Sequence, residues 1–114
     1  MAEIRQYVPA ETELKLIVRI EPIGELTADD YEFEIEAKAW RQKVVKFKKS
    51  ETIRVDENSR IVVVDTGQVG YGDLKLRIVA QIPDSDLPDQ YRKEVCILDT
   101  YVTIIEDDSW KCLA

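Results

Sequence analysis

The sequence predicts an all-β domain, an antiparallel β-sandwich of about seven to eight strands. Residues 31–40 and 73–82 alternate between apolar and polar side chains, the period of a strand with one buried face. Turn-forming residues separate such segments about every 8–12 residues, and no segment shows a sustained helical period. A small β-barrel is the alternative architecture.

Composition narrows the classes of function. The chain has 114 residues, of which 45% are hydrophobic, so one domain with a core is expected. The net charge of -7 argues against nonspecific binding to nucleic acid or to an anionic membrane. Histidine is absent, which removes the commonest general base and metal ligand. We therefore expect no enzyme and no cofactor.

The first elements are an arm and a strand. Residues 1–12 have no clean period and contain Pro9, so we expect an arm with a short edge strand near 5–8. Residues 13–21 alternate, and Ile17 is the one apolar side chain on their polar face. Pro22 ends this strand, and Gly24 provides a turn in the connection that follows. The inward side chains are predicted to be Leu14, Leu16, Val18 and Ile20.

The central strand is predicted at residues 31–40, and the next strand at 44–48. Pairing Ile35 with Phe47 places both side chains inside. The same register sets Glu34 opposite Lys48 and Glu36 opposite Lys46, which brings opposite charges together. It requires an odd-numbered loop around residue 41, or a bulge near residue 40.

A short strand at 51–55, with Ile53 and Val55 inward, precedes a turn and a strand at 60–65. The run Ile61–Val64 is continuously apolar, which is typical of a strand buried on both faces or covered by a partner. We assign Val62 and Val64 to the outward side. Residues 66–72 hold most of the glycines and form a loop with one helical turn.

The last strands follow an acidic loop. Residues 73–82 form a strand whose even-numbered side chains point inward, and residues 83–90 form the loop. Residues 91–105 exceed one ordinary strand, so we split them near residues 99–100, with Cys96 in the core. The domain organisation is an arm at 1–12, a sandwich at 13–106 and a tail at 107–114.

Three features have a chemical and a structural interpretation. Asp84, Asp86 and Asp89 could offer carboxylates to calcium, but Pro88 and the missing glycine favour a solvated turn. The basic residues of 41–49 could bind phosphate, but neutralisation of the neighbouring glutamates is favoured. Cys96 could pair with Cys112, although reduced thiols fit the expected compartment better.

A protein–protein interface is the remaining candidate site. Exposed aromatic and apolar side chains are enriched in interfaces. Trp110 could instead fold back over the core. The candidate interface residues are Trp40, Lys46, Lys48, Val62, Val64, Trp110 and Leu113.

The order of strands and turns resembles a known family. The segments Asp-Tyr-Glu-Phe-Glu-Ile-Glu from residue 30, Val-Asp-Thr-Gly-Gln-Val-Gly-Tyr-Gly-Asp-Leu-Lys from residue 64 and Ile-Pro-Asp-Ser-Asp-Leu-Pro-Asp-Gln-Tyr from residue 82 are similar to small prophage-encoded Ig-like proteins of gut bacteria. Their plan is similar to the Ig-like N-terminal domain of siphophage upper-baseplate proteins. The resemblance covers roughly residues 13–106.

This resemblance implies an Ig-like β-sandwich that docks other tail or baseplate subunits, usually as a symmetric homo-oligomer. Such a protein is made in the cytoplasm and joins the virion. The net charge of -7 leads us to expect no nucleic-acid or membrane partner. One alternative is a cell-surface or periplasmic Ig-like adhesion module that binds carbohydrate, although no signal peptide is visible. Another is a small enzyme that works through Asp84 and Asp86.

Overall fold

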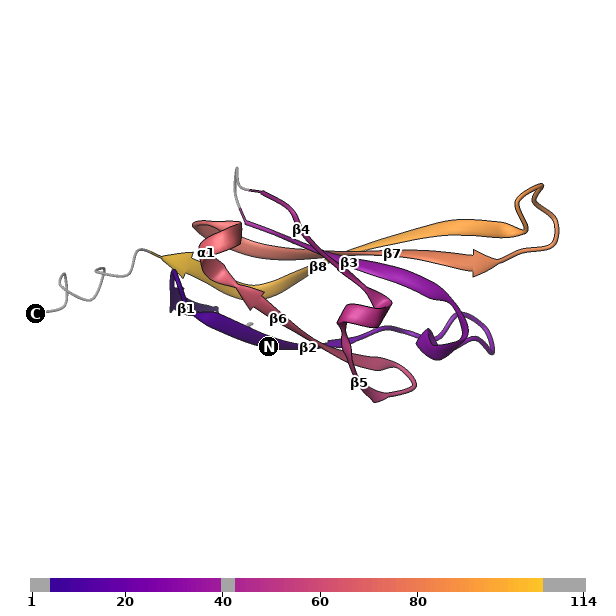
Figure 1. Ribbon diagram of the computed structural model, residues 1–114, viewed down its shortest axis with the longest axis horizontal. Coiled ribbons are helices and arrows are strands. Elements are labelled where there is room, and N and C mark those ends of the chain that lie inside the picture. The colour runs from indigo at the N-terminus through magenta and orange to yellow at the C-terminus, as the bar shows by residue number, and fades with distance from the viewer. Residues whose placement is uncertain (1–4, 40–42, 106–114) are drawn as a thin grey trace, which may run out of the picture.

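The computed structural model describes residues 5–39 and 43–105. These residues form eight strands, one short α-helix and two 3-10 turns (Figure 1). In chain order the elements are β1 Gln6–Pro9, β2 Glu13–Arg19, η1 Ala28–Asp30, β3 Glu32–Lys38, β4 Val45–Lys48, η2 Lys49–Glu51, β5 Ile53–Asp56, β6 Ser59–Asp65, α1 Thr66–Val69, β7 Gly72–Pro83 and β8 Tyr91–Ile105.

The strands form two sheets, which confirms the predicted all-β sandwich. One sheet has the order β1-β8-β7-β3-β4 and the other has the order β2-β6-β5. With β2 as the first strand of an immunoglobulin domain's B-E-D sheet, the five-stranded sheet reads G-F-C-C′ from β8 to β4, which is the Ig strand order. Strand β1 extends this five-stranded sheet by pairing in parallel with the end of β8.

The central hairpin has the predicted register. Ile35 pairs with Phe47, Glu34 with Lys48 and Glu36 with Lys46. Ile35 is fully buried because β3 lies between β4 and β7 and its inner face packs on the three-stranded sheet. The predicted odd-numbered loop includes residues 40–42, which lie outside the described residues.

Alternation also gives the correct inner faces of β2 and β7. Val18 and Ile20 are buried, and Leu14 and Leu16 pack partly buried against the core, whereas Ile17 is exposed. In β7 the predicted inward residues are all buried: Leu74, Leu76, Ile78, Ala80 and Ile82. The helical turn expected near residue 66 is α1.

The predicted orientation of the apolar run in β6 is wrong. Val62 and Val64 are 1% and 0% exposed, and Val63 is the exposed residue of the run. The register with β2 gives the reason, since Val62 pairs with Leu16 and Val64 with Leu14, and paired residues share a sheet face. The core-facing side of β2 therefore sets that of β6.

Two other assignments are corrected. Ile53 and Val55, predicted to point inward, are 55% and 48% exposed because β5 is a short edge strand beyond β6. The predicted split of the last strand is replaced by one strand with a bulge, where pairing jumps from Lys75–Asp99 to Asp73–Thr103.

Side-chain hydrogen bonds hold this bulge together. Tyr101 takes a left-handed φ of 58° there, and its N–H donates to Asp99 Oδ1. Thr100 Oγ1 donates to the Leu74 carbonyl over 2.8 Å, and it accepts from the Val102 N–H. The strand can therefore remain continuous through an irregular stretch of backbone.

Candidate functional site

The predicted interface residues that the structure describes do not lie together. Lys46 and Lys48 are exposed on the outer face of one sheet, whereas β6 belongs to the other sheet, whose outer face points the opposite way. Val62 and Val64 are buried and cannot contact a partner. Trp40, Trp110 and Leu113 lie outside the described residues.

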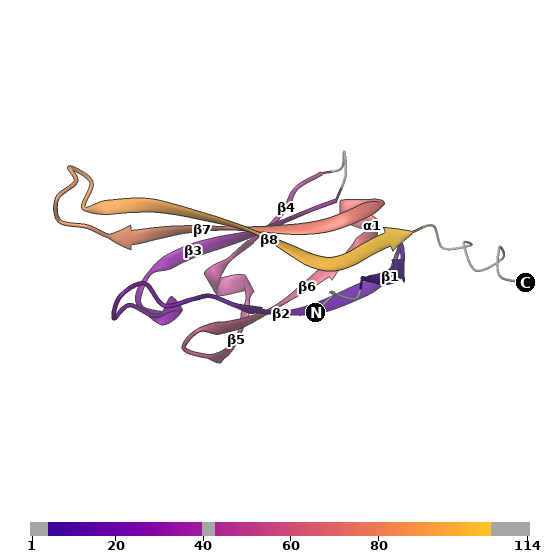
Figure 2. The same cartoon turned by 180° about the vertical axis from the view of Figure 1, so that it is seen from behind.

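Strand β8 instead presents an open sheet edge. Its pairing with β7 runs from Tyr91 to Ile104, but its pairing with β1 begins only at Val102. Among the described residues, no strand pairs with the other side of β8 between Tyr91 and Leu98. Figures 1 and 2 show that the β7–β8 hairpin extends past the neighbouring strands at one end of the sandwich.

Apolar side chains are concentrated on this edge. Val95 is 45% exposed and Ile97 is 70% exposed, and they stand side by side on the outer face of the sheet, opposite Val79 and Arg77. Cys96, between them, is exposed, so its prediction as a core residue is wrong. It shares a sheet face with the buried Ile78, but the outlying position of the edge strand leaves it uncovered.

The hydrogen bonds of the β7–β8 hairpin determine which N–H and C=O groups of β8 point toward the open edge. The Asp84 N–H donates to the Gln90 carbonyl, and hydrogen-bonded and non-hydrogen-bonded pairs alternate along an antiparallel ladder. Counting from that pair, Cys96 is hydrogen-bonded to Ile78. The N–H and C=O groups of Lys93, Val95 and Ile97 therefore point away from β7, toward the open edge.

A small apolar hollow lies beside the same edge. It has a volume of about 250 Å³ and lies between β8 and the connection that follows β2. Its lining includes Ile20, Ile23, Tyr31, Ile78, Cys96 and Leu98. The hydroxyl of Tyr31 is buried and has no hydrogen-bond partner in the described structure. Apolar surface at this edge therefore continues inward between the two sheets.

An ion cluster closes the far end of the open edge. Asp99 accepts hydrogen bonds from Lys75 over 2.7 Å and from Arg5 over 2.9 Å. The Lys75 ammonium is the main cause that lowers the pKa of Asp99 to about 2, with help from the Tyr101 N–H and Arg5. Arg5 also pairs with Asp73. These contacts attach the start of β1 to the bulge, so the open edge ends near Asp99.

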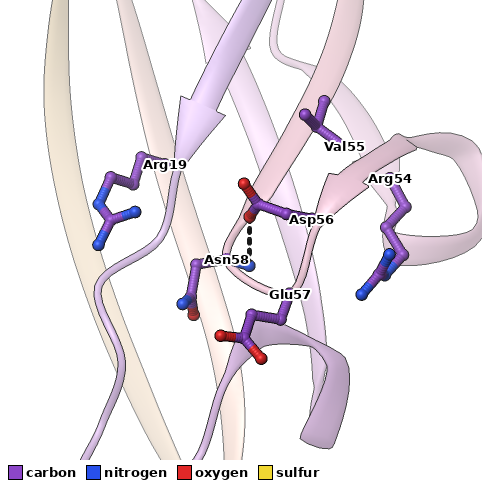
Figure 3. A pocket seen from close by; sticks show the side chains of 6 residues that line it. All are labelled: Arg19, Arg54, Val55, Asp56, Glu57 and Asn58. Carbon is purple, nitrogen blue, oxygen red and sulfur yellow. Dashed lines mark hydrogen bonds between the residues drawn. The ribbon is translucent and has the colours of Figure 1, made fainter.

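A second, polar recess lies near the β5–β6 turn (Figure 3). Arg19, Arg54, Val55, Asp56, Glu57 and Asn58 line it, and its volume is about 510 Å³. Asp56 accepts a 2.8 Å hydrogen bond from the Asn58 N–H, which is the main cause that lowers its pKa. This carboxylate therefore stabilises the turn, and the lining given above contains no serine, threonine, cysteine or lysine.

The acidic loop is organised as a turn. Asp84 Oδ1 accepts from the Asp86 N–H, and Asp84 Oδ2 pairs with Arg92 at 3.3 Å. Across residues 5–39 and 43–105, no three acidic or cysteine side chains gather as metal ligands would. In the basic strip, Lys48 and Lys46 lie opposite Glu34 and Glu36, as predicted, while the ion pair of Glu36 is made with Arg77.

Comparison with protein-family models, with curated proteins and with solved structures gave no match for this chain. Within the part of the chain that the structure describes, no helix is both long and apolar enough to cross a membrane. The fold places the domain among Ig-type β-sandwiches, and a functional assignment depends on the β8 edge itself.

Sequence reasoning missed this edge although the signal for it was present. The run Val95–Leu98 is continuously apolar, like Ile61–Val64, and such a run is consistent with burial on both faces or with a covering partner. In β6 the run is flanked by strands on both sides, and in β8 it lies on an edge. Strand order, which local pattern does not contain, separates the two cases.

Proposed function

We propose that this protein is a noncatalytic assembly module whose β8 edge accepts a strand from a partner protein. The observation that carries the proposal is the open edge at residues 91–98 with Val95 and Ile97 exposed on it. Natural β-proteins protect such edges with charges, prolines, bulges or covering segments, because an open apolar edge promotes pairing with other chains. Strand addition satisfies its backbone groups and covers its apolar side chains.

The assembly we propose is a phage or prophage tail or baseplate. The resemblance of residues 13–106 to prophage-encoded Ig-like proteins supports this setting, and so does the Ig strand order. In such an assembly the protein positions its neighbours, and its function requires no catalytic group. The chain would be made in the cytoplasm and then become part of the virion.

The test uses particles from the strain that encodes the chain. We expect mass spectrometry of purified particles to find the protein at a fixed copy number per particle. An Ile97→Lys variant should be lost from the particles, because a lysine in the paired edge places a charge against apolar side chains.

Ile17→Lys is the matched control. Ile17 is 69% exposed, against 70% for Ile97, but it lies on the other sheet, so this variant should be incorporated normally. A protein that is expressed but absent from purified particles would contradict the virion assignment. Equal incorporation of both variants would contradict the role of the β8 edge.

A further inference from the structure

We propose that the β8 edge pairs with the same edge of a second copy, antiparallel and with Cys96 of both copies on the twofold axis. The inference rests on the proposed function, since it names the partner strand at the site described above. It is carried by the outer-face side chains of the edge, which are complementary to themselves when the strand is reversed about residue 96.

The outer-face side chains match in this arrangement. Reversal about Cys96 sets Val95 of one copy opposite Ile97 of the other, so that the exposed apolar side chains cover each other. It also sets Lys93 opposite Asp99, so that Lys93 joins Lys75 and Arg5 around this carboxylate at both ends of the apolar contact. On the inner face, Leu98 of one copy lies opposite Glu94 of the other, beside the hollow.

The backbone groups match as well. Lys93, Val95 and Ile97 direct their N–H and C=O groups to the open edge, so the Val95–Ile97 and Lys93–Asp99 pairs become the hydrogen-bonded ones. Cys96 then forms a non-hydrogen-bonded pair with its own copy, at a Cα separation of about 4.5 Å. That separation falls within the range that a disulfide can span, and the ladder ends beside Asp99 because β1 occupies the edge from Val102.

Other twofold registers lose this complementarity. Reversal about Val95 sets Lys93 opposite Ile97, and reversal about Ile97 sets Val95 opposite Asp99. Each places a charged side chain against an apolar one on the outer face, where the pairing about Cys96 sets apolar against apolar and confines its charged–apolar contact, Glu94 with Leu98, to the inner face. The pairing about Cys96 therefore specifies both the occupant of the edge and its register.

Two measurements test the inference. The reduced wild-type chain should sediment as a dimer that dissociates on dilution, and Ile97→Lys should raise its Kd at least about tenfold. Ile17→Lys adds the same charge on the other sheet and should not raise the Kd. A monomer at all concentrations, or a dimer equally stable in the Ile97→Lys variant, would overturn the inference.

The second measurement reports the register. In a Cys112→Ser chain, diamide should join two Cys96 thiols into a disulfide, each thiol giving up one proton and one electron to reduce diamide to its hydrazine. Crosslinking of this chain should be at least about tenfold slower when Ile97→Lys is added, since collision alone then brings the thiols together. Equal rates would overturn the pairing about Cys96.

A mixing experiment removes dependence on Cys96 itself. We mix two variants that both carry Cys96→Ser and Cys112→Ser. One of them also carries Val95→Cys, and the other also carries Ile97→Cys. The two variants should crosslink to each other faster than either does to itself, and the reverse preference would overturn the register. A chain that is monomeric in solution but present in particles would overturn the twofold pair while supporting the proposed function.

Discussion

At the residue scale, Asp29 shows how a single side chain attaches a loop to the sandwich. It lies in η1 and pairs with Arg54 on β5 and Arg60 on β6. Arg60 is 2% exposed, and its guanidinium also donates to the Asp56 and Ser59 carbonyls and lies over the Phe33 ring. The connection between β2 and β3 is thereby attached to the opposite edge of the sandwich.

This contact makes stability depend on pH. The hydrogen bond from Arg54 is the main cause that lowers the pKa of Asp29 from 3.8 to about 2. A carboxylate with a lowered pKa in the folded state adds stability above its unfolded pKa, and this contribution is lost as the pH falls through the folded pKa. The Asp29 contribution is therefore complete at pH 7 and disappears between about pH 4 and pH 2.

We expect Asp29→Asn to be less stable than wild type at pH 7, with a difference that shrinks as the pH approaches 2. Urea denaturation at several pH values gives the unfolding midpoints of the wild-type and Asp29→Asn chains. Asp89→Asn, at the exposed tip of the β7–β8 hairpin, should remain close to wild type throughout. If the difference in stability between Asp29→Asn and wild type stayed constant with pH, the ion pairs of Asp29 would not be its cause.

At the scale of elements, β6 and β8 show two outcomes for the same kind of apolar run. In β6, pairing with β2 and β5 occupies both sides of the strand, and alternate valines enter the core. In β8, the run Val95–Leu98 has one neighbouring strand, so even Cys96, which shares the sheet face of Ile78, is exposed. The position of each strand in its sheet decides whether the run is buried, because the local composition of the two runs is alike.

Because Val62 faces the core and Val63 faces solvent, substitutions of these adjacent valines should change stability by very different amounts. Val62→Asp should destabilise the domain by at least about 3 kcal/mol, because it adds an unpaired carboxylate to the core and removes apolar contacts. Val63→Asp should change stability by less than about 0.5 kcal/mol, because Val63 is 39% exposed. Thermal unfolding followed by circular dichroism compares them, and a more severe effect at Val63 would show that the strand faces the other way.

At the scale of the whole molecule, net charge opposes self-association. Each chain carries a net charge of -7, so two copies repel each other while the β8 edges attract over a short range. The length over which salt screens this repulsion falls from about 30 Å at 0.01 M to about 10 Å at 0.1 M. Salt therefore weakens the long-range repulsion more than it weakens apolar contacts and backbone hydrogen bonds.

We expect the dimer's Kd to decrease several-fold between about 10 mM and 150 mM NaCl. Sedimentation equilibrium of the reduced chain at both concentrations measures this change, with Ile17→Lys as a second sample of altered net charge. An increase in Kd with salt would mean that the Lys93–Asp99 pairs dominate the association.

The sequence by itself determined the inner faces of β2, β3 and β7 and the pairing of Ile35 with Phe47. Each depends on side-chain alternation, which a strand carries locally. Tertiary structure alone decided the orientation of Val62 and Val64 and the exposure of Cys96. A continuous apolar run contains no alternation from which to choose a face, and an edge exists only once strands distant in sequence have been ordered into a sheet.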